Sequence, residues 1–421
     1  MYVIMKKRVV KFFSEVGKLS NEDRSYLLTG TVCRDGRLIK GQYILIRDGK
    51  IVTMGPADQA PTSFSGEKYS FPEQFTIVPG YIDVHIHGAN GADAMDATTE
   101  ALETMARTLP REGTTAFFPT TMTQAKEKIA AALENAATFM EHHNARGQAE
   151  VTGIHLEGPF INPARKGAQP EEYVIQPDPQ LFDEWQKLAN GNIRLVTVAP
   201  ERENGFTFVR HITEQGVIAS IGHSDADFTE VKEAVAAGAN HVTHLYNGMK
   251  GLHHREPGTA GGALLLDELY VEIIADGFHI HPEMIRLAIR TKGLERVILV
   301  TDSMRAKWLP DGKSELGGQE VFVKDGKATL ANGSLAGSIL KMKDAVKNVM
   351  AFAGLSLPEA VKLATENPAR HLGIFDRKGS LDAGKDADIV ILNEQYDPVI
   401  TFCRGIIAYK GVNVTSESHS C

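Results

Sequence analysis

Histidine and carboxylate side chains stand at the ends of apolar, β-type runs along this 421-residue chain. His85 and His87 are two apart in IDVHIHG, and alternate residues of a strand share one face, so both imidazoles can reach one metal ion. Glu157 ends the apolar run of GIHLEGPF, where a carboxylate is costly unless it is paired or bound to a cation. His223 in IGHSD and His244 in HVTHLYNGM follow two further apolar runs. Together these side chains predict a metal site.

Each of these residues alone also has a structural interpretation, as a strand cap or a salt-bridged carboxylate. Their repetition at separate strand ends favours ligation, and nitrogen and oxygen ligands without thiolate suit Zn²⁺, Fe²⁺ or Mn²⁺. Three protein ligands plus water are typical of a catalytic site rather than a structural one. Cys33, Cys403 and Cys421 show no CxxC spacing, which excludes a thiolate zinc site and a disulfide scaffold.

Two further strand-end residues are candidates for proton transfer and for polarising a carbonyl group. Asp302 ends RVILVTDSM, where it could be a helix N-cap, but it follows the series of ligands at the place where water needs a base. His279 in ADGFHIHP can donate a hydrogen bond to a polarised carbonyl. His155, two residues before the glutamate, and His281, followed by a proline, are interpreted as structural.

Two loops are candidates for ligand binding. GLHHREPG (251–258) is basic, and the guanidinium fork of Arg255 matches an oxyanion, although a short charged loop is usually just solvated. Asn247 and Gly248 precede it and add a backbone donor. LAGSIL (335–340) is a small-residue loop that permits close approach of a ligand or simple packing.

The elements that must position these residues alternate between apolar β-type runs and amphipathic helical segments. Such alternation over eight runs predicts an α/β protein with a (β/α)₈ TIM barrel, whose functional residues lie at the C-terminal strand ends. A hairpin over 321–330, around Asp325-Gly326, is expected as a late insertion. The runs are 75–87, 114–121, 150–160, 193–200, 217–225, 241–249, 269–281 and 296–304.

Both ends of the chain are β-rich instead, with a hairpin signal at Asp48-Gly49. Their edge strands need partners, so we expect one small β-sandwich built from both ends. The predicted organisation is an N-terminal tail over 1–25, a β-sandwich over 26–78 and 378–412, a barrel over 79–377 and a C-terminal tail over 413–421.

Composition places the chain among ordinary globular proteins, with 43% hydrophobic and 23% charged residues. The net charge of −8 and the absence of a basic stripe argue against nucleic acid as a partner. No apolar run approaches the roughly 18 residues of a membrane span, so we expect no membrane association and a cytoplasmic location.

The ordered motifs HIHG, HLEGPF, GHSD, THLYNGM, DGFH and TDSM resemble the amidohydrolase superfamily. Within it, HLEGPF with a downstream KGAQ, THLYNGM and HHREPG are similar to the deacetylases of N-acetylated amino-sugar phosphates. The similarity runs from about Tyr26 to Lys410, and GKDADIVIL (384–392) matches the family's return into the β-sandwich.

The resemblance implies a role for each ligand. Glu157, His223 and His244 match the metal site that all members share, and His85 and His87 match a second site that some members have lost. The intact pair implies one or two divalent ions per subunit, zinc or iron first and manganese or cobalt as alternatives, with the glutamate as the bridge. A glutamate at that point, rather than a carboxylated lysine, argues against a hydantoinase or dihydroorotase.

The resemblance also implies the remaining site residues. Asp302 matches the catalytic acid and base, and His279 matches the contact to the amide carbonyl. Arg255 matches an arginine that reaches the substrate phosphate in the neighbouring subunit, which implies a homodimer. The other expected substrate contacts are Ala168, Asn247, Gly248, Leu335, Ala336 and Gly337.

The implied activity is hydrolysis of the acetamide of N-acetyl-D-glucosamine 6-phosphate to D-glucosamine 6-phosphate and acetate, in amino-sugar catabolism or cell-wall recycling. Three alternatives stay open at this stage. They are a deacetylase for N-acetylgalactosamine 6-phosphate, an amidohydrolase acting on a cyclic amide, and a metal-free relative that kept the fold for assembly.

Overall fold

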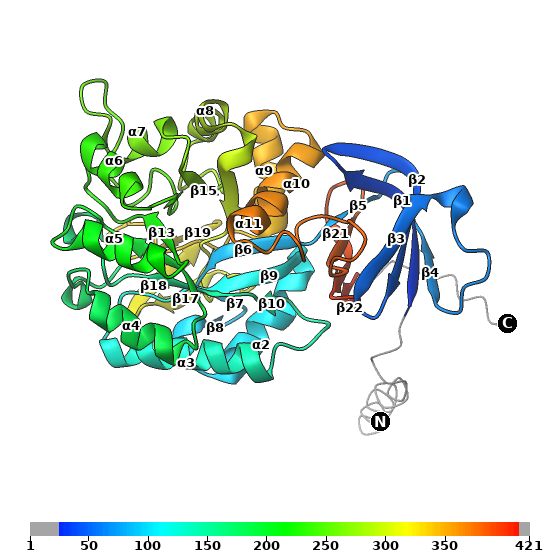
Figure 1. Cartoon of the computed structure of the whole chain (residues 1–421), viewed down its shortest axis with the longest axis horizontal. Helices are drawn as coiled ribbons and strands as arrows, with labels where there is room; N and C mark the ends of the chain where they lie inside the picture. Colours follow the sequence, from blue (N-terminus) through cyan, green and yellow to red (C-terminus); the bar gives the residue numbers. More distant parts are fainter. Residues whose placement is uncertain (1–24, 412–421) are drawn as a thin grey trace.

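The computed structural model describes residues 25–411, and its centre is formed by parallel strands surrounded by helices (Figure 1). The predicted tails, 1–25 and 413–421, lie outside the described residues except for Ser25. One parallel sheet has the order β10-β9-β6, and the other runs from β11 to β16 in sequence order. The strands are β6 (Tyr81–Ile86), β9 (Thr114–Pro119), β10 (Glu150–Val151), β11 (Ile154–Glu157), β12 (Ile193–Val198), β13 (Ile218–Ile221), β14 (His241–Val242), β15 (Tyr270–Ile274) and β16 (Val297–Val300).

The two parallel sheets meet at both edges. Parallel bridges join Ile86 to Ser303 at one edge and Thr120 to His155 at the other. Backbone hydrogen bonds extend these junctions, since the amide of Asp302 donates to the carbonyl oxygen of His85 over 2.8 Å. Each predicted run contains at least one strand, and the parallel pairing within each sheet places the carboxyl ends of neighbouring strands at the same edge.

The helices pack against the outside of these strands through their apolar faces, with a core of buried aliphatic and aromatic side chains between the two layers (Figure 1). Capping fixes where several begin: Asp227 and Glu230 form a capping box at α6, and Asp178 accepts two amides at α4. The helices are α2 (Thr99–Thr108), α3 (Lys126–His142), α4 (Pro179–Leu188), α5 (Gly205–Glu214), α6 (Phe228–Ala236), α7 (Gly258–Leu265), α8 (Pro282–Lys292), α9 (Met342–Ala353), α10 (Leu357–Ala364) and α11 (Glu366–His371). Within residues 25–411, none of these helices has the length and apolar character needed to cross a membrane.

Both ends of the described chain meet in a separate sheet of eight strands (Figure 1). Its order is β22-β21-β20-β5-β1-β2-β3, with β4 beside β1, and the antiparallel pairing of β20 with β5 joins the two ends of the chain. Asp48 (φ 52°) and Gly49 (φ 81°) form the predicted two-residue turn between β2 and β3. The strands are β1 (Tyr26–Arg34), β2 (Arg37–Arg47), β3 (Lys50–Pro56), β4 (Glu67–Ser70), β5 (Thr76–Pro79), β20 (Ile389–Leu392), β21 (Pro398–Cys403) and β22 (Ile406–Lys410).

Two details differ from the sequence-based expectation. The run 75–87 is not one strand, because it divides at Gly80 into β5 of the end sheet and β6 of the parallel sheet. The hairpin expected over 321–330 is present, with its turn at Asp325-Gly326, but a further strand precedes it. This insertion comprises β17 (Gly312–Leu316), β18 (Gln319–Lys324) and β19 (Lys327–Thr329), and a short hairpin of β7 (Gly88–Ala89) and β8 (Ala92–Asp93) follows β6.

Candidate active site and metal centre

The five predicted ligands converge at the carboxyl ends of four parallel strands. His85 lies on β6 with His87 just beyond it, and Glu157 is the last residue of β11. His223 and His244 each follow their strand by two residues, with φ angles of 48° and 30°. Positive φ is unfavourable for a histidine, and such strain concentrates at functional sites. All five side chains are buried.

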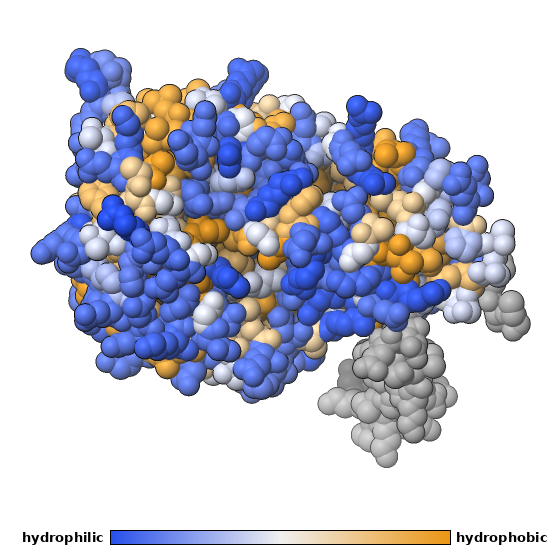
Figure 2. Space-filling model, in the orientation of Figure 1, coloured by the Kyte–Doolittle hydropathy of each residue, from blue (hydrophilic) through white to orange (hydrophobic). Residues whose placement is uncertain are grey.

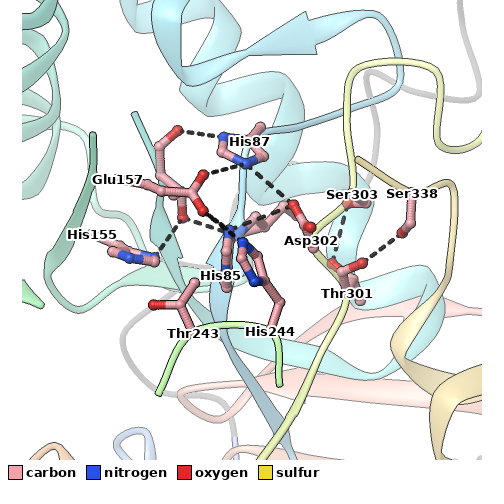
Figure 3. Close-up of polar contacts among 12 residues, drawn as sticks. His85, His87, His155, Glu157, Thr243, His244, Thr301, Asp302, Ser303 and Ser338 are labelled. Carbon is pink, nitrogen blue, oxygen red and sulfur yellow. Dashed lines mark hydrogen bonds and ion pairs between the residues drawn. The ribbon is translucent and has the colours of Figure 1, made fainter. Parts of the chain in front are cut away.

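Glu157 lies at the centre of this cluster (Figure 3). Its Oε1 is 3.2 Å from Nε2 of His244, 3.3 Å from Nε2 of His223 and 3.5 Å from Nε2 of His85. Its Oε2 is 3.2 Å from Nε2 of His87. Burial alone would raise the pKa of Glu157, but the surrounding imidazoles hold it well below its usual value, so the carboxylate is ionised.

The donor atoms fit a divalent cation better than they fit one another. Nε2 of His223 and Nε2 of His244 face each other over 3.1 Å, and Nε2 of His85 is buried without a hydrogen-bond partner. Buried nitrogen lone pairs are normally satisfied, so lone pairs that converge without a donor between them fit the ligands of a cation. Three groups of side chains have ligand atoms close enough together to hold one ion: His85–His87–Asp302, Glu157–His223–His244 and His85–His155–Glu272. The first two contain the predicted ligands and Asp302.

The outer ring nitrogens fix how these imidazoles point. Nδ1 of His223 donates to the carbonyl oxygen of Arg165 over 2.8 Å, and Nδ1 of His87 donates to that of Thr120 over 3.2 Å. A proton held on Nδ1 leaves the Nε2 lone pair free, which is the usual way in which a protein prepares a metal-binding histidine.

Asp302 lies against the ligand cluster at the edge of the pocket. Its Oδ1 is 3.2 Å from Nε2 of His87 and 3.5 Å from Nε2 of His85. Burial acts to raise the pKa of Asp302, but His85 and His87 lower it below its usual value. Its backbone is also in the left-handed region, with φ 47°. A carboxylate held there in its basic form can accept a proton.

His279 is oriented by a residue that the sequence analysis did not single out. Asp276 accepts from Nδ1 of His279 over 2.6 Å and from the backbone amides of Phe278 and His279, each over 2.8 Å. Burial lowers the pKa of His279, but the carboxylate of Asp276 outweighs this and raises it. The signal was present in DGFH, because an aspartate three residues before a histidine can reach its ring.

The ligand cluster forms the floor of an open pocket of about 300 Å³. Two of the predicted substrate contacts, Ala336 and Arg255, do not line the pocket. Ala336 is fully buried in a small apolar cluster with Met304 and Leu316. Its neighbours in sequence face the pocket instead. The predicted residues in the wall are Ala168, Asn247, Gly248, His279, Asp302, Leu335 and Gly337.

Arg255 does not line this pocket and lies on an exposed loop before α7. Its Nη1 donates to Nε2 of His254 over 2.7 Å, and its amide donates to Nδ1 of His253 over 3.3 Å. The structure therefore brings together all the predicted ligands and pocket residues of one subunit except Arg255 and Ala336.

Two buried polar residues beside the ligands were missed. Gln169 donates from Nε2 to Oε2 of Glu157 over 3.1 Å and accepts the amide of Thr123 over 2.7 Å. Glu272 contacts His85, with Oε2 2.9 Å from its Nδ1. Gln169 ends the KGAQ motif, and Glu272 is a lone acid in the apolar run YVEII, so both carried a signal.

Neither of the two histidines interpreted as structural, His155 and His281, lines the pocket. His155 pairs through Nε2 with Oγ1 of Thr197 over 2.7 Å, and burial holds its pKa well below the usual value. His281 is the N-cap of α8 and accepts the amide of Glu283.

Comparisons with known proteins agree with this geometry. The model of the amidohydrolase family matches residues 76–409, and the chain belongs to this family. At the level of individual enzymes, the chain is 46% identical to N-acetylglucosamine-6-phosphate deacetylase of Bacillus subtilis, over 90% of this chain and 95% of the relative.

Two further relatives bear on the substrate. The chain is 37% identical to N-acetylgalactosamine-6-phosphate deacetylase of Escherichia coli O157:H7, over 83% of this chain and 89% of the relative. Its fold matches a mutant N-acetyl-D-glucosamine-6-phosphate deacetylase from Mycobacterium smegmatis, solved with N-acetyl-D-glucosamine-6-phosphate. That match has a TM-score of 0.85 and 30% identity and covers 92% of this chain and 100% of the other.

Proposed function

We propose that this chain hydrolyses the acetamide of N-acetyl-D-glucosamine 6-phosphate to D-glucosamine 6-phosphate and acetate, in amino-sugar catabolism or cell-wall recycling. The observation that carries the proposal is the pocket, in which ionised Glu157 faces imidazole lone pairs and Asp302 lies at the edge. The curated relatives support the choice of substrate.

Glu157, His223 and His244 would hold one divalent ion, and His85 and His87 with Glu157 a second. Zinc or iron fits these ligands first, with manganese or cobalt as alternatives. When bound, the ion supplies Lewis acidity, which makes water nucleophilic at neutral pH and polarises the amide carbonyl.

Side chains of the protein transfer the protons and stabilise the negative charge that develops on the carbonyl oxygen. Asp302 accepts a proton from the attacking water and then delivers it to the departing nitrogen, so that the amine leaves as a neutral group. Asp276 accepts from Nδ1 of His279 and raises its pKa, which favours the imidazolium form. In that form Nε2–H is also present and can donate to the carbonyl oxygen as it becomes negative. The pocket walls fix the acetamide against these groups, so that binding energy from the sugar phosphate aids the chemistry.

The strand pairing supports a finer description of the fold. We infer that the parallel strands form one (β/α)₈ barrel over 79–377, since bridges link the sheets at both edges. The strands of 26–78 and 378–412 would form a β-sandwich around their shared core, which includes Tyr26, Ile44 and Phe402.

Arg255 would act as a phosphate ligand in the site of a second subunit, in a homodimer. The loop that carries Arg255 is exposed, and Arg255 does not line the pocket of its own subunit. Apolar side chains near this loop are also exposed, including Leu252 (53%), Leu265 (59%) and Leu287 (42%), and Figure 2 shows apolar surface over α7. A guanidinium fork suits a phosphate dianion.

We also propose a cytoplasmic location. It is supported by Cys33 and Cys403, which are buried free thiols without a disulfide partner among the described residues.

Initial rates of acetate release on four compounds test the substrate. We expect the highest kcat/KM on N-acetylglucosamine 6-phosphate, less on its galacto epimer, little on unphosphorylated N-acetylglucosamine and none on a hydantoin. The galactosamine relative makes the epimer the second candidate. A higher kcat/KM on the galacto epimer would replace the proposed substrate, and hydantoin cleavage would replace the reaction class.

A further inference from the structure

A buried carboxylate contacts the ligand cluster from a strand that carries none of the ligands. Glu272 is the third residue of β15, has no exposed surface and follows buried Val271 in an otherwise apolar strand. A charge in such a place is costly unless hydrogen bonds and opposite charges compensate it fully. The groups that contact the Glu272 carboxylate therefore indicate its role.

Three donors surround this carboxylate. Oε2 accepts from Nδ1 of His85 over 2.9 Å and from the backbone amide of His244 over 3.0 Å. Oε1 pairs with Nε2 of His241 over 3.0 Å. One oxygen of Glu272 thus holds the ring of one proposed ligand and the backbone of another.

These two ligands belong to different groups of the cluster. His85 groups with His87 and Asp302, whereas His244 groups with Glu157 and His223. The strand β6, which carries His85, is not paired with β15, so the contact made by Glu272 is independent of the sheet hydrogen bonds between neighbouring strands.

Each contact fixes a property that a metal ligand needs. An ionised carboxylate only accepts, so Nδ1 of His85 carries the proton and its Nε2, which has no hydrogen-bond partner, keeps a free lone pair. The backbone of His244 has φ 30°, an unfavourable conformation that must be held by surrounding contacts. The bond from its amide to Glu272 is such a contact.

We propose that Glu272 is a positioning residue that couples the two halves of the metal centre, an inference that rests on the metal centre proposed above. It fixes the tautomer of His85 and the backbone of His244 through one oxygen, and removing its charge weakens both metal-binding groups together. A purely structural Glu272, needed only to pair with His241, would change the stability of the protein and leave metal affinity unchanged.

The test is the affinity of the full-length metal-free protein for Zn²⁺ alone, measured by chelator competition with elemental analysis of the bound ions. Glu272→Gln keeps the shape, removes the charge and offers one acceptor oxygen and an NH₂ group, so His241 must either face a donor or move its proton to Nδ1. We expect the dissociation constants of all bound Zn²⁺ ions to rise about 10- to 100-fold, the usual cost of losing an outer partner of a ligand. Glu272→Asp, which keeps the charge on a shorter chain, should recover part of the affinity.

Two controls separate the alternatives. His241→Asn removes the partner that is not a proposed ligand, and its Zn²⁺ affinity should match the wild type. His85→Ala should weaken only the ion of its own group. A thermal unfolding transition shows for each metal-free variant that the protein is folded. If Glu272→Gln does not fold, the Zn²⁺ affinity of Glu272→Asp is compared with the wild type instead.

Wild-type Zn²⁺ affinity in the folded Glu272 variants would overturn the inference, and weakening of only one ion would overturn the coupling. Failure of the wild type itself to bind Zn²⁺ would overturn the metal centre and, with it, this role for Glu272.

Discussion

Two clusters of buried charge differ in which groups face one another and in whether a pocket opens onto them. In the first, at the junction of the end sheet with the parallel strands, Lys378 is 1% exposed and its Nζ lies 2.6 Å from Glu150, 2.5 Å from Asp388 and 3.3 Å from Asp386. Arg377 adds contacts of 3.1 Å to Glu150 and 2.8 Å to Asp386. Each carboxylate there faces a cation within 2.8 Å, and Lys378 lines none of the four cavities described within residues 25–411.

In the second cluster, formed by the predicted metal ligands and Asp302, the carboxylates face imidazoles instead of cations. Glu157 and Asp302 face imidazoles whose nitrogens converge, one of them buried without a partner, and a pocket opens onto them. Burial of charge is common to both clusters, so it does not mark function. Lone pairs that converge on one another beside a cavity do, because only a cation or a substrate can satisfy them.

Glu157→Ala should have the largest effect on activity, since this carboxylate contacts four imidazoles. We expect deacetylase activity to be lost and the metal content, measured by elemental analysis, to fall. His85→Ala is the control and should be milder, because the shared site keeps Glu157, His223 and His244. Wild-type turnover and metal content in Glu157→Ala would show that this cluster is misassigned.

Asp302→Asn should lower kcat by about 10²- to 10⁴-fold, the usual contribution of a general acid or base, and by more if both proton transfers depend on it. Metal content and substrate binding should be retained, because the amide has nearly the same shape. Steady-state kinetics with elemental analysis checks this. A kcat near the wild-type value would remove Asp302 from the mechanism.

Lys378→Met should affect stability rather than chemistry. Loss of one partner from a buried ionic cluster costs about 3–5 kcal/mol, because carboxylates are left uncompensated. Urea unfolding should show this loss at neutral pH, while the metal content of the folded protein stays unchanged. A loss of metal with unchanged stability would reverse the distinction between the clusters.

The stability difference between wild type and Lys378→Met should also depend on pH. Burial acts to raise the pKa of Glu150 and of Asp386, but Lys378 and the nearby arginines lower both below their ordinary values of 4.5 and 3.8. Groups with a lowered pKa stabilise the fold above those ordinary values and lose this contribution as the pH falls. The stability difference between wild type and Lys378→Met should therefore shrink in acid.

Arg255→Ala should have the smallest effect, confined to phosphate binding. KM for the phosphorylated sugar should rise, with little change in the rate on plain N-acetylglucosamine. Co-expression with Asp302→Asn chains should restore some activity, because one hybrid site regains both residues. A protein that is monomeric in sedimentation and fully active at high dilution would contradict a shared site.

The ligands could be predicted from sequence because each follows an apolar strand, and the parallel arrangement collects strand ends in one region. Glu272 and Asp276 were harder to assign, since their roles depend on which side chains face them across the fold. The placement of Ala336 inside the small apolar cluster depends on local backbone direction, which a small-residue loop does not reveal. The division of 75–87 at Gly80 lies close to the predicted domain boundary at 78/79, but the run was interpreted as one strand because both of its halves are mostly apolar.

The most direct test of the account is to titrate the metal-free protein with Zn²⁺ while measuring acetate release from N-acetylglucosamine 6-phosphate. The account predicts negligible activity without metal and a rise that stops when the groups of Glu157, His223 and His244 and of His85 and His87 are filled. Full acetate release by the metal-free protein, or no release at any Zn²⁺ concentration with iron, manganese and cobalt equally inactive, would contradict it.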